Sequence, residues 1–63
     1  MIERFNNWIQ DTQDYSKIKT KEEYIARKSN DAVLYGIKVI GMTPHEAYKF
    51  GDAICKLETR RLS

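Results

Sequence analysis

Residues 32–51 read AVLYGIKVIGMTPHEAYKFG, and the spacing of small residues in this stretch predicts the fold. Ala32 precedes Gly36 by four residues, and Ala47 precedes Gly51 by the same interval. Residues four apart lie one turn above the other on the same face of an α-helix. A glycine inside a helix costs about 1 kcal/mol relative to alanine. Two glycines at matching positions therefore indicate a role in packing two helices together.

The segment between the two small-residue pairs carries strong signals for a chain reversal. Gly41 suits the C-terminal cap of a helix, where a left-handed backbone is favourable only without a side chain. Thr43 and Glu46 have the spacing of a capping box, and Pro44 occupies the first helical position. The sequence therefore predicts one helix that ends before the turn at 41–42 and another that begins directly after it.

A hairpin with this turn would bring together residues whose numbers add to 83. Gly36 would face Ala47, and Ala32 would face Gly51. The two backbones could then approach to the short end of the ~8–10 Å range for packed helices. The alternative is that the gap beside the glycines receives a bulky side chain from an N-terminal helix, such as Trp8.

The rest of the chain predicts one more helix and a polar connection. Apolar side chains recur on one face of residues 2–12, whereas residues 13–19 show no helical pattern. Thr20 and Glu23 repeat the capping-box spacing before a long helical stretch. Ser29, Asn30 and Asp31 favour helix ends, so this stretch could be one helix or two. The predicted fold is all-α in a single domain, 1–63, with helices at 2–12, 20–40 and 43–61 forming a short N-terminal helix and a long antiparallel helical hairpin. The last helix is expected to bury Ala47, Phe50, Gly51, Ile54 and Leu57.

Length and composition favour a small soluble protein that self-associates. A chain of 63 residues buries a smaller fraction of its surface than a larger domain does, and its single cysteine, Cys55, allows no internal disulfide. Pairing into a dimeric helical bundle is a common way to stabilise such a chain. No apolar run reaches the ~20 residues that span a bilayer, and the N-terminus lacks a signal-peptide core. We therefore expect a cytoplasmic protein.

The sequence shows no pattern of residues typical of an enzyme. His45 is the only histidine, and no second histidine or cysteine stands at a metal-ligand spacing from it. No histidine is placed by sequence to activate Cys55. Phosphate-binding loops and nucleophile elbows are absent from the sequence. We expect no enzymatic activity, no cofactor, no metal and no small-molecule substrate.

Positive charge gathers at the open end of the predicted hairpin. Eight lysines and arginines meet three acidic residues there, although the whole chain carries a net charge of only +2. Such an end could contact nucleic acid or an acidic protein. The basic residues are Lys17, Lys19, Lys21, Arg27, Lys28, Lys56, Arg60 and Arg61.

Apolar side chains outside the predicted seam favour a protein interface. Leu34 and Ile37 on one helix, Tyr48 on the other, and Tyr35 on the opposite flank do not point along the seam. An apolar patch left over on a small protein often marks an interaction site. The favoured function is therefore a regulatory or interaction protein that binds another protein as a homodimer.

Residues 41–50 also resemble the turn and recognition helix of a helix-turn-helix. The resemblance rests on the turn glycine, the apolar residue after it, Thr43 at the helix start, and Ala47 and Phe50 pointing inward. It implies a DNA-binding regulator, which is the alternative function. The side chains that would then face a major groove are Pro44, His45, Tyr48 and Lys49.

Overall fold

The computed structural model describes residues 2–63, and every regular element in this range is helical. The elements are α1 (Ile2–Thr12), α2 (Lys21–Tyr35), the π-helical turn η1 (Gly36–Ile40) and α3 (Pro44–Leu62). No β-strand occurs within residues 2–63. The prediction of an all-α fold is confirmed.

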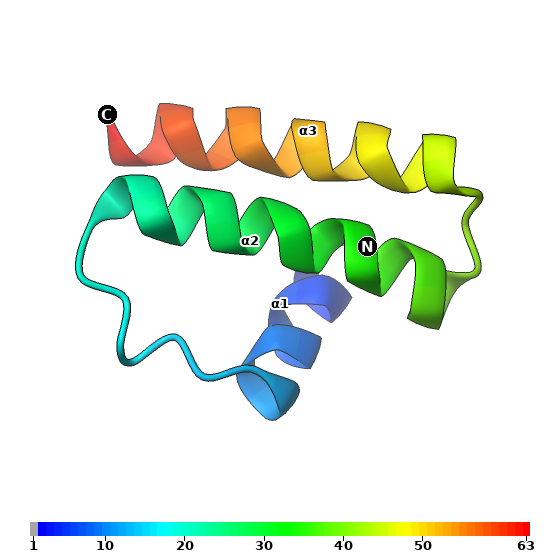
Figure 1. Cartoon of the computed structure of the whole chain (residues 1–63), viewed down its shortest axis with the longest axis horizontal. Coiled ribbons are helices and arrows are strands. Elements are labelled where there is room, and N and C mark those ends of the chain that lie inside the picture. Colours follow the sequence, from blue (N-terminus) through cyan, green and yellow to red (C-terminus); the bar gives the residue numbers. More distant parts are fainter. Residues whose placement is uncertain (1) are drawn as a thin grey trace.

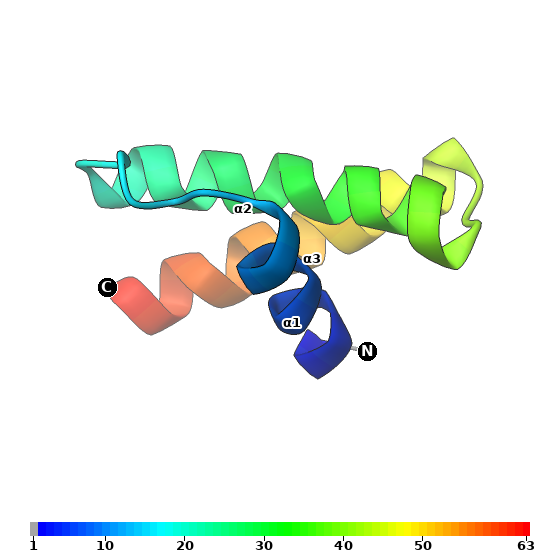
Figure 2. The ribbon, with the colours of Figure 1, turned by 90° about the horizontal axis from the view of Figure 1, so that it is seen from below.

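The two longest helical segments lie side by side and run in opposite directions (Figures 1 and 2). η1 continues α2 directly, so one unbroken helical rod extends from residue 21 to residue 40. Ser29 and Asn30 therefore do not interrupt it. α1 lies on one side of the α2–α3 pair and crosses it near the middle of its length (Figures 1 and 2).

Local hydrogen bonds define the turn between the two long segments. The Gly36 carbonyl accepts from the amides of Gly41 and Met42, and Gly41 adopts the left-handed conformation with φ 86°. The Thr43 hydroxyl accepts from the Glu46 amide at 3.3 Å, and the Glu46 carboxylate accepts from the Thr43 amide at 3.2 Å. The capping box expected at this position is present.

Small residues line the seam between α2 and α3. A Cβ atom added to Gly36 would lie 3.4 Å from the Ala47 Cβ, and one added to Gly51 would lie 2.6 Å from Val33 Cγ2. The Ser29 hydroxyl donates to the Gly51 carbonyl at 2.9 Å across the same seam. The neighbours of both glycines thus come from the two long segments and from the turn. Trp8 does not fill this gap.

Aromatic rings attach α1 to the α2–α3 pair. Phe5 is fully buried (0% exposed), and its ring centroid lies 5.4 Å from that of Tyr35 and 5.5 Å from that of Phe50. Trp8 adds a contact with Tyr35 at 5.3 Å. Ala32 and Ile54 complete the buried cluster beneath these rings. The core therefore lies where α1 crosses the two longer segments.

Candidate functional site

The α2–α3 pair has one side covered by α1 and one side without a covering element. Tyr35 and Phe50 point toward α1, because both rings contact Phe5. Ile37 and Tyr48 each stand two residues from one of these rings, which places them about half a turn away on the helix surface. They are 41% and 66% exposed, respectively. The side of the pair away from α1 therefore presents large apolar side chains to solvent.

Apolar residues follow this side of α2 and of α3 at intervals of seven. We define the uncovered face by Ala26 and Val33 from α2, by Ile37 and Ile40 from η1, and by Tyr48, Cys55 and Leu62 from α3. A seven-residue spacing keeps side chains on nearly the same face of a helix and is typical of helices that pack against further helices. Sequence inspection missed this spacing, although it is visible in the printed sequence.

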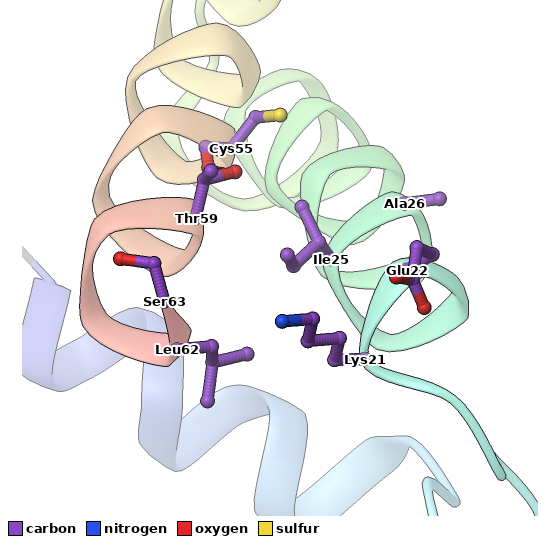
Figure 3. A pocket seen from close by; sticks show the side chains of 8 residues that line it. All are labelled: Lys21, Glu22, Ile25, Ala26, Cys55, Thr59, Leu62 and Ser63. Carbon is purple, nitrogen blue, oxygen red and sulfur yellow. Dashed lines mark hydrogen bonds between the residues drawn. The ribbon is translucent and has the colours of Figure 1, made fainter.

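A groove of about 420 Å³ lies at one end of the uncovered face, where α2 begins and α3 ends. Figure 3 shows Ile25 and Lys21 from α2 and Leu62 from the end of α3 pointing into the space between the two helices. Cys55 and Thr59 extend the lining along α3. Ile25, Cys55 and Leu62 are half-buried. The groove is therefore a mostly apolar depression into which the Lys21 side chain also extends.

The four side chains predicted to form a protein interface separate into different environments. Ile37 and Tyr48 lie on the uncovered face, and Leu34 is half-buried. Tyr35 is only 2% exposed and belongs to the core, contrary to the expectation that it faces a partner. The physical reason is the position of α1, whose Phe5 and Trp8 rings cover Tyr35.

Two opposite charges occupy interior positions of the α2–α3 seam. Lys28 is 7% exposed and Glu58 is 4% exposed, and the Lys28 ammonium donates to the Glu58 carboxylate at 2.8 Å. Arg61 binds the other carboxylate oxygen at 2.7 Å. Lys28 was expected to contact nucleic acid or an acidic partner, but the structure buries it and pairs its charge with Glu58 inside the fold. The signal was present in the sequence, since Lys28 precedes Ala32 by four residues and Glu58 follows Ile54 by four.

A second polar cluster attaches the 13–19 connection to α2. The Tyr15 hydroxyl donates to the Asp31 carboxylate, and Arg27 binds the same carboxylate at 3.5 Å. Arg27 also donates to the Gln13 side chain at 3.1 Å. Burial and the hydrogen bond to Asp31 raise the pKa of Tyr15 well above its ordinary value. Tyr15 therefore stays protonated and serves as a structural donor.

The open end of the α2–α3 pair retains exposed positive charge after these pairs are formed. Arg27, Lys28, Lys56 and Arg61 each bind a carboxylate of the same chain. Within residues 2–63, no salt bridge engages the other four predicted cations, all of them exposed. These are Lys17, Lys19, Lys21 and Arg60.

The residues proposed for major-groove contacts are exposed at the start of α3. Pro44, His45, Tyr48 and Lys49 all reach solvent. However, α3 lies along α2 for most of its length (Figure 1), whereas the two helices of a helix-turn-helix meet at ≈ 90–120°. The arrangement of α2 and α3 therefore differs from that of a helix-turn-helix.

Neither the metal-ligating side chains, the helices nor the comparisons with known proteins point to a particular function. Within residues 2–63, no three His, Cys, Asp or Glu side chains are placed to hold a metal ion together. None of the helices in the described range has the length and apolar character needed to cross a bilayer. No family model, curated protein or solved structure was found to match the chain.

Proposed function

We propose that this protein is a non-enzymatic interaction protein that binds other proteins and works as a homodimer. The observation that carries the proposal is the uncovered face, on which Ile37 and Tyr48 are exposed and on which Tyr48, Cys55 and Leu62 follow one another at intervals of seven residues along α3. Burying apolar surface yields roughly 25 cal/mol per Å². A second layer of helices on this face would therefore stabilise a chain that is short for independent folding.

The exposed cations at the open end supply a surface for a further partner. Lys17, Lys19, Lys21 and Arg60 carry charge that no salt bridge within residues 2–63 neutralises. Complementary charge accelerates association and selects partners more than it adds affinity. An acidic protein surface fits this end of the molecule.

The homodimer is tested by measuring molar mass in solution. Light scattering during gel filtration should give twice the monomer mass of 7.4 kDa for the unmodified chain. Tyr48→Asp and Ile37→Asp should give the monomer mass with an unchanged helical circular dichroism signal, because each places a charge in the apolar interface. A chain that stays monomeric at millimolar concentration would refute the proposal.

A matched control comes from the side of α3 that faces away from the proposed interface. Leu57 is exposed, contrary to the expectation that the last helix buries it, and it follows Phe50 by seven residues, so it lies on the α1 side of the helix. Leu57→Asp should therefore leave the dimer mass unchanged. Loss of the dimer in this variant would show that added charge acts in a nonspecific way.

Nucleic-acid binding is the second candidate, favoured by the same exposed cations. Duplex binding through phosphate contacts releases counterions, so affinity should fall steeply as salt rises. Replacing Lys19 and Arg60 with glutamate should abolish such binding, whereas Lys38→Glu near the turn should have a smaller effect. The absence of duplex binding at low ionic strength would eliminate this candidate.

A further inference from the structure

We propose that two copies pack through their uncovered faces in opposite directions, with Tyr48 of each copy seated in the groove of the other. This inference rests on the proposed homodimer and adds its orientation and its central contact. Tyr48 stands near the turn between η1 and α3, while the groove lies at the far end of the same face. A protrusion and a depression thus occupy opposite ends of one surface.

Two-fold symmetry makes this placement self-complementary. In a symmetric dimer the same patch is used twice, so that each residue pair across the interface occurs in both directions. Turning one copy end for end puts its Tyr48 over the groove of the other and brings the second Tyr48 over the remaining groove. Both protrusions and both depressions are then used. The opposite choice, with turn beside turn, would leave both grooves without an occupant.

The groove offers chemistry that suits a tyrosine. The half-buried side chains of Ile25, Cys55 and Leu62 provide an apolar floor, and a volume of about 420 Å³ accommodates one aromatic side chain. Lys21 points into the groove, Glu22 and Thr59 line it, and each of these side chains can bond the phenolic hydroxyl. Buried tyrosines normally need such a partner for the hydroxyl group. Tyr48 is the most exposed large apolar side chain in the described range, at 66%.

Charge favours the same orientation. Packing the copies with their open ends together would bring two sets of Lys17, Lys19, Lys21 and Arg60 into proximity, and like charges facing each other oppose association. The reversed orientation separates these ends. When Tyr48 of one copy lies opposite Thr59 in the groove of the other, residues of the two α3 helices oppose each other if their numbers add to about 107. This register also places Asp52 near Lys56 of the second copy. Both side chains are exposed and already form a salt bridge of 3.1 Å within the chain.

A double-mutant cycle tests the contact between Tyr48 and the groove. Tyr48→Ala should weaken the dimer by roughly tenfold or more, as expected for a central aromatic anchor. Thr59→Trp, at an exposed position on the groove wall, should weaken it similarly by occupying the groove. Because both changes remove the same contact, the dimer of the double variant should dissociate no more readily than the dimer of the less stable single variant. The dissociation constants come from sedimentation equilibrium, with Leu57→Ala as the unchanged control.

Orientation is tested by cross-linking mixed variants in a Cys55→Ser background, and because Cys55 lines the groove this background is first shown to have the same dimer dissociation constant as the unmodified chain. His45→Cys marks the turn end of α3, and Ser63→Cys marks the open end. A short bismaleimide should couple the two variants when they are mixed and should give no dimer with either variant alone. Coupling of His45→Cys to itself would show that turn ends meet, and this would overturn the inference.

The outcomes separate this inference from the homodimer on which it rests. If the unmodified chain dimerises but the effects of Tyr48→Ala and Thr59→Trp simply multiply, the seating of Tyr48 is refuted and the homodimer stands. If the unmodified chain does not dimerise, both proposals are refuted. A cycle in which the effects do not multiply, together with coupling only in the mixture, supports the full arrangement.

Discussion

At the residue scale, the two seam glycines serve different purposes. A methyl group on Gly51 would meet Val33 Cγ2 at 2.6 Å and the Ser29 carbonyl oxygen at 3.0 Å, and the latter belongs to the backbone. A methyl group on Gly36 would meet the Met42 sulfur at 2.9 Å, which is the movable end of a flexible side chain. Close approach of the two backbones thus requires glycine at position 51 more strictly than at position 36.

Gly51→Ala should therefore destabilise the protein, and Gly36→Ala should not. Alanine gains about 1 kcal/mol in helix propensity over glycine, whereas overpacking costs about 1–3 kcal/mol. We expect a net loss of about 1 kcal/mol for Gly51→Ala and little change or a small gain for Gly36→Ala, measured by urea denaturation. A gain in stability for Gly51→Ala would contradict the close packing of α2 and α3 at this level.

The buried Glu58 carboxylate should make stability depend on pH. Burial raises the pKa of Glu58, but the hydrogen bonds from Lys28 and Arg61 outweigh burial and lower the pKa below its ordinary value of 4.5. The unfolded chain then binds more protons than the folded chain in acid. The stability contributed by Glu58 is therefore present above the unfolded-state pKa and is lost as pH falls through the folded-state pKa.

We expect the free energy of unfolding to fall as pH decreases below about 4.5, and Glu58→Gln to reduce this dependence. Glutamine cannot titrate, so the variant should be less stable than the unmodified chain near neutral pH and closer to it in acid. Urea denaturation at a series of pH values measures both curves. Parallel curves for the two proteins would show that Glu58 does not contribute through ionisation.

At the element scale, the helix ends depend on side chains within four residues of each end. Thr20 accepts from the Glu23 amide at 3.1 Å at the start of α2, and Thr43 begins α3 with a complete capping box. Gly41 ends the rod formed by α2 and η1 with its positive φ. Each signal acts on the backbone next to it, which is why these ends can be read from the sequence.

Replacing Gly41 tests whether the left-handed conformation is required at the turn. No atom lies within 4 Å of an added Cβ at Gly41, so Gly41→Ala should introduce backbone strain without a steric clash. We expect a loss of about 1 kcal/mol in the free energy of unfolding. Gly41→Asn is the matched control and should lose less, because asparagine tolerates this conformation. Equal losses in the two variants would point to a cause other than backbone strain.

At the scale of the whole molecule, one short helix determines which surface is free. α1 places Phe5 and Trp8 against Tyr35, and it leaves Ile37 and Tyr48 in solvent. α1 is the shortest of the three α-helices and covers only one side of the two longer ones. The proposed second copy would cover the other side and complete a two-sided core.

Coupling of folding to dimerisation predicts a melting temperature that rises with protein concentration. Only the folded chain dimerises, so mass action stabilises the folded state as protein concentration increases. We expect this rise for the unmodified chain and its absence for Tyr48→Asp, followed by circular dichroism over a hundredfold range of concentration. A concentration-independent melting temperature in the unmodified chain would indicate that the monomer folds alone.

Sequence patterns predicted the all-α fold, because helical periodicity, caps and the turn glycine act over a few neighbouring residues. The same patterns identified Ile37 and Tyr48 as exposed apolar side chains, since both stand off the small-residue seam. They did not predict which polar groups are buried. Lys28 was expected at the surface, yet it is paired with Glu58, thirty residues later in the chain.

The tertiary structure alone decided the environment of Tyr35 and the existence of a free face. Tyr35 is buried because α1 crosses α2 at that level, and the crossing point depends on rings from both ends of the chain packing together. Such contacts join residues far apart in sequence, so local spacing carries little information about them. Backbone capping and periodicity are local and can be read directly, whereas the burial of a side chain depends on every element that reaches it.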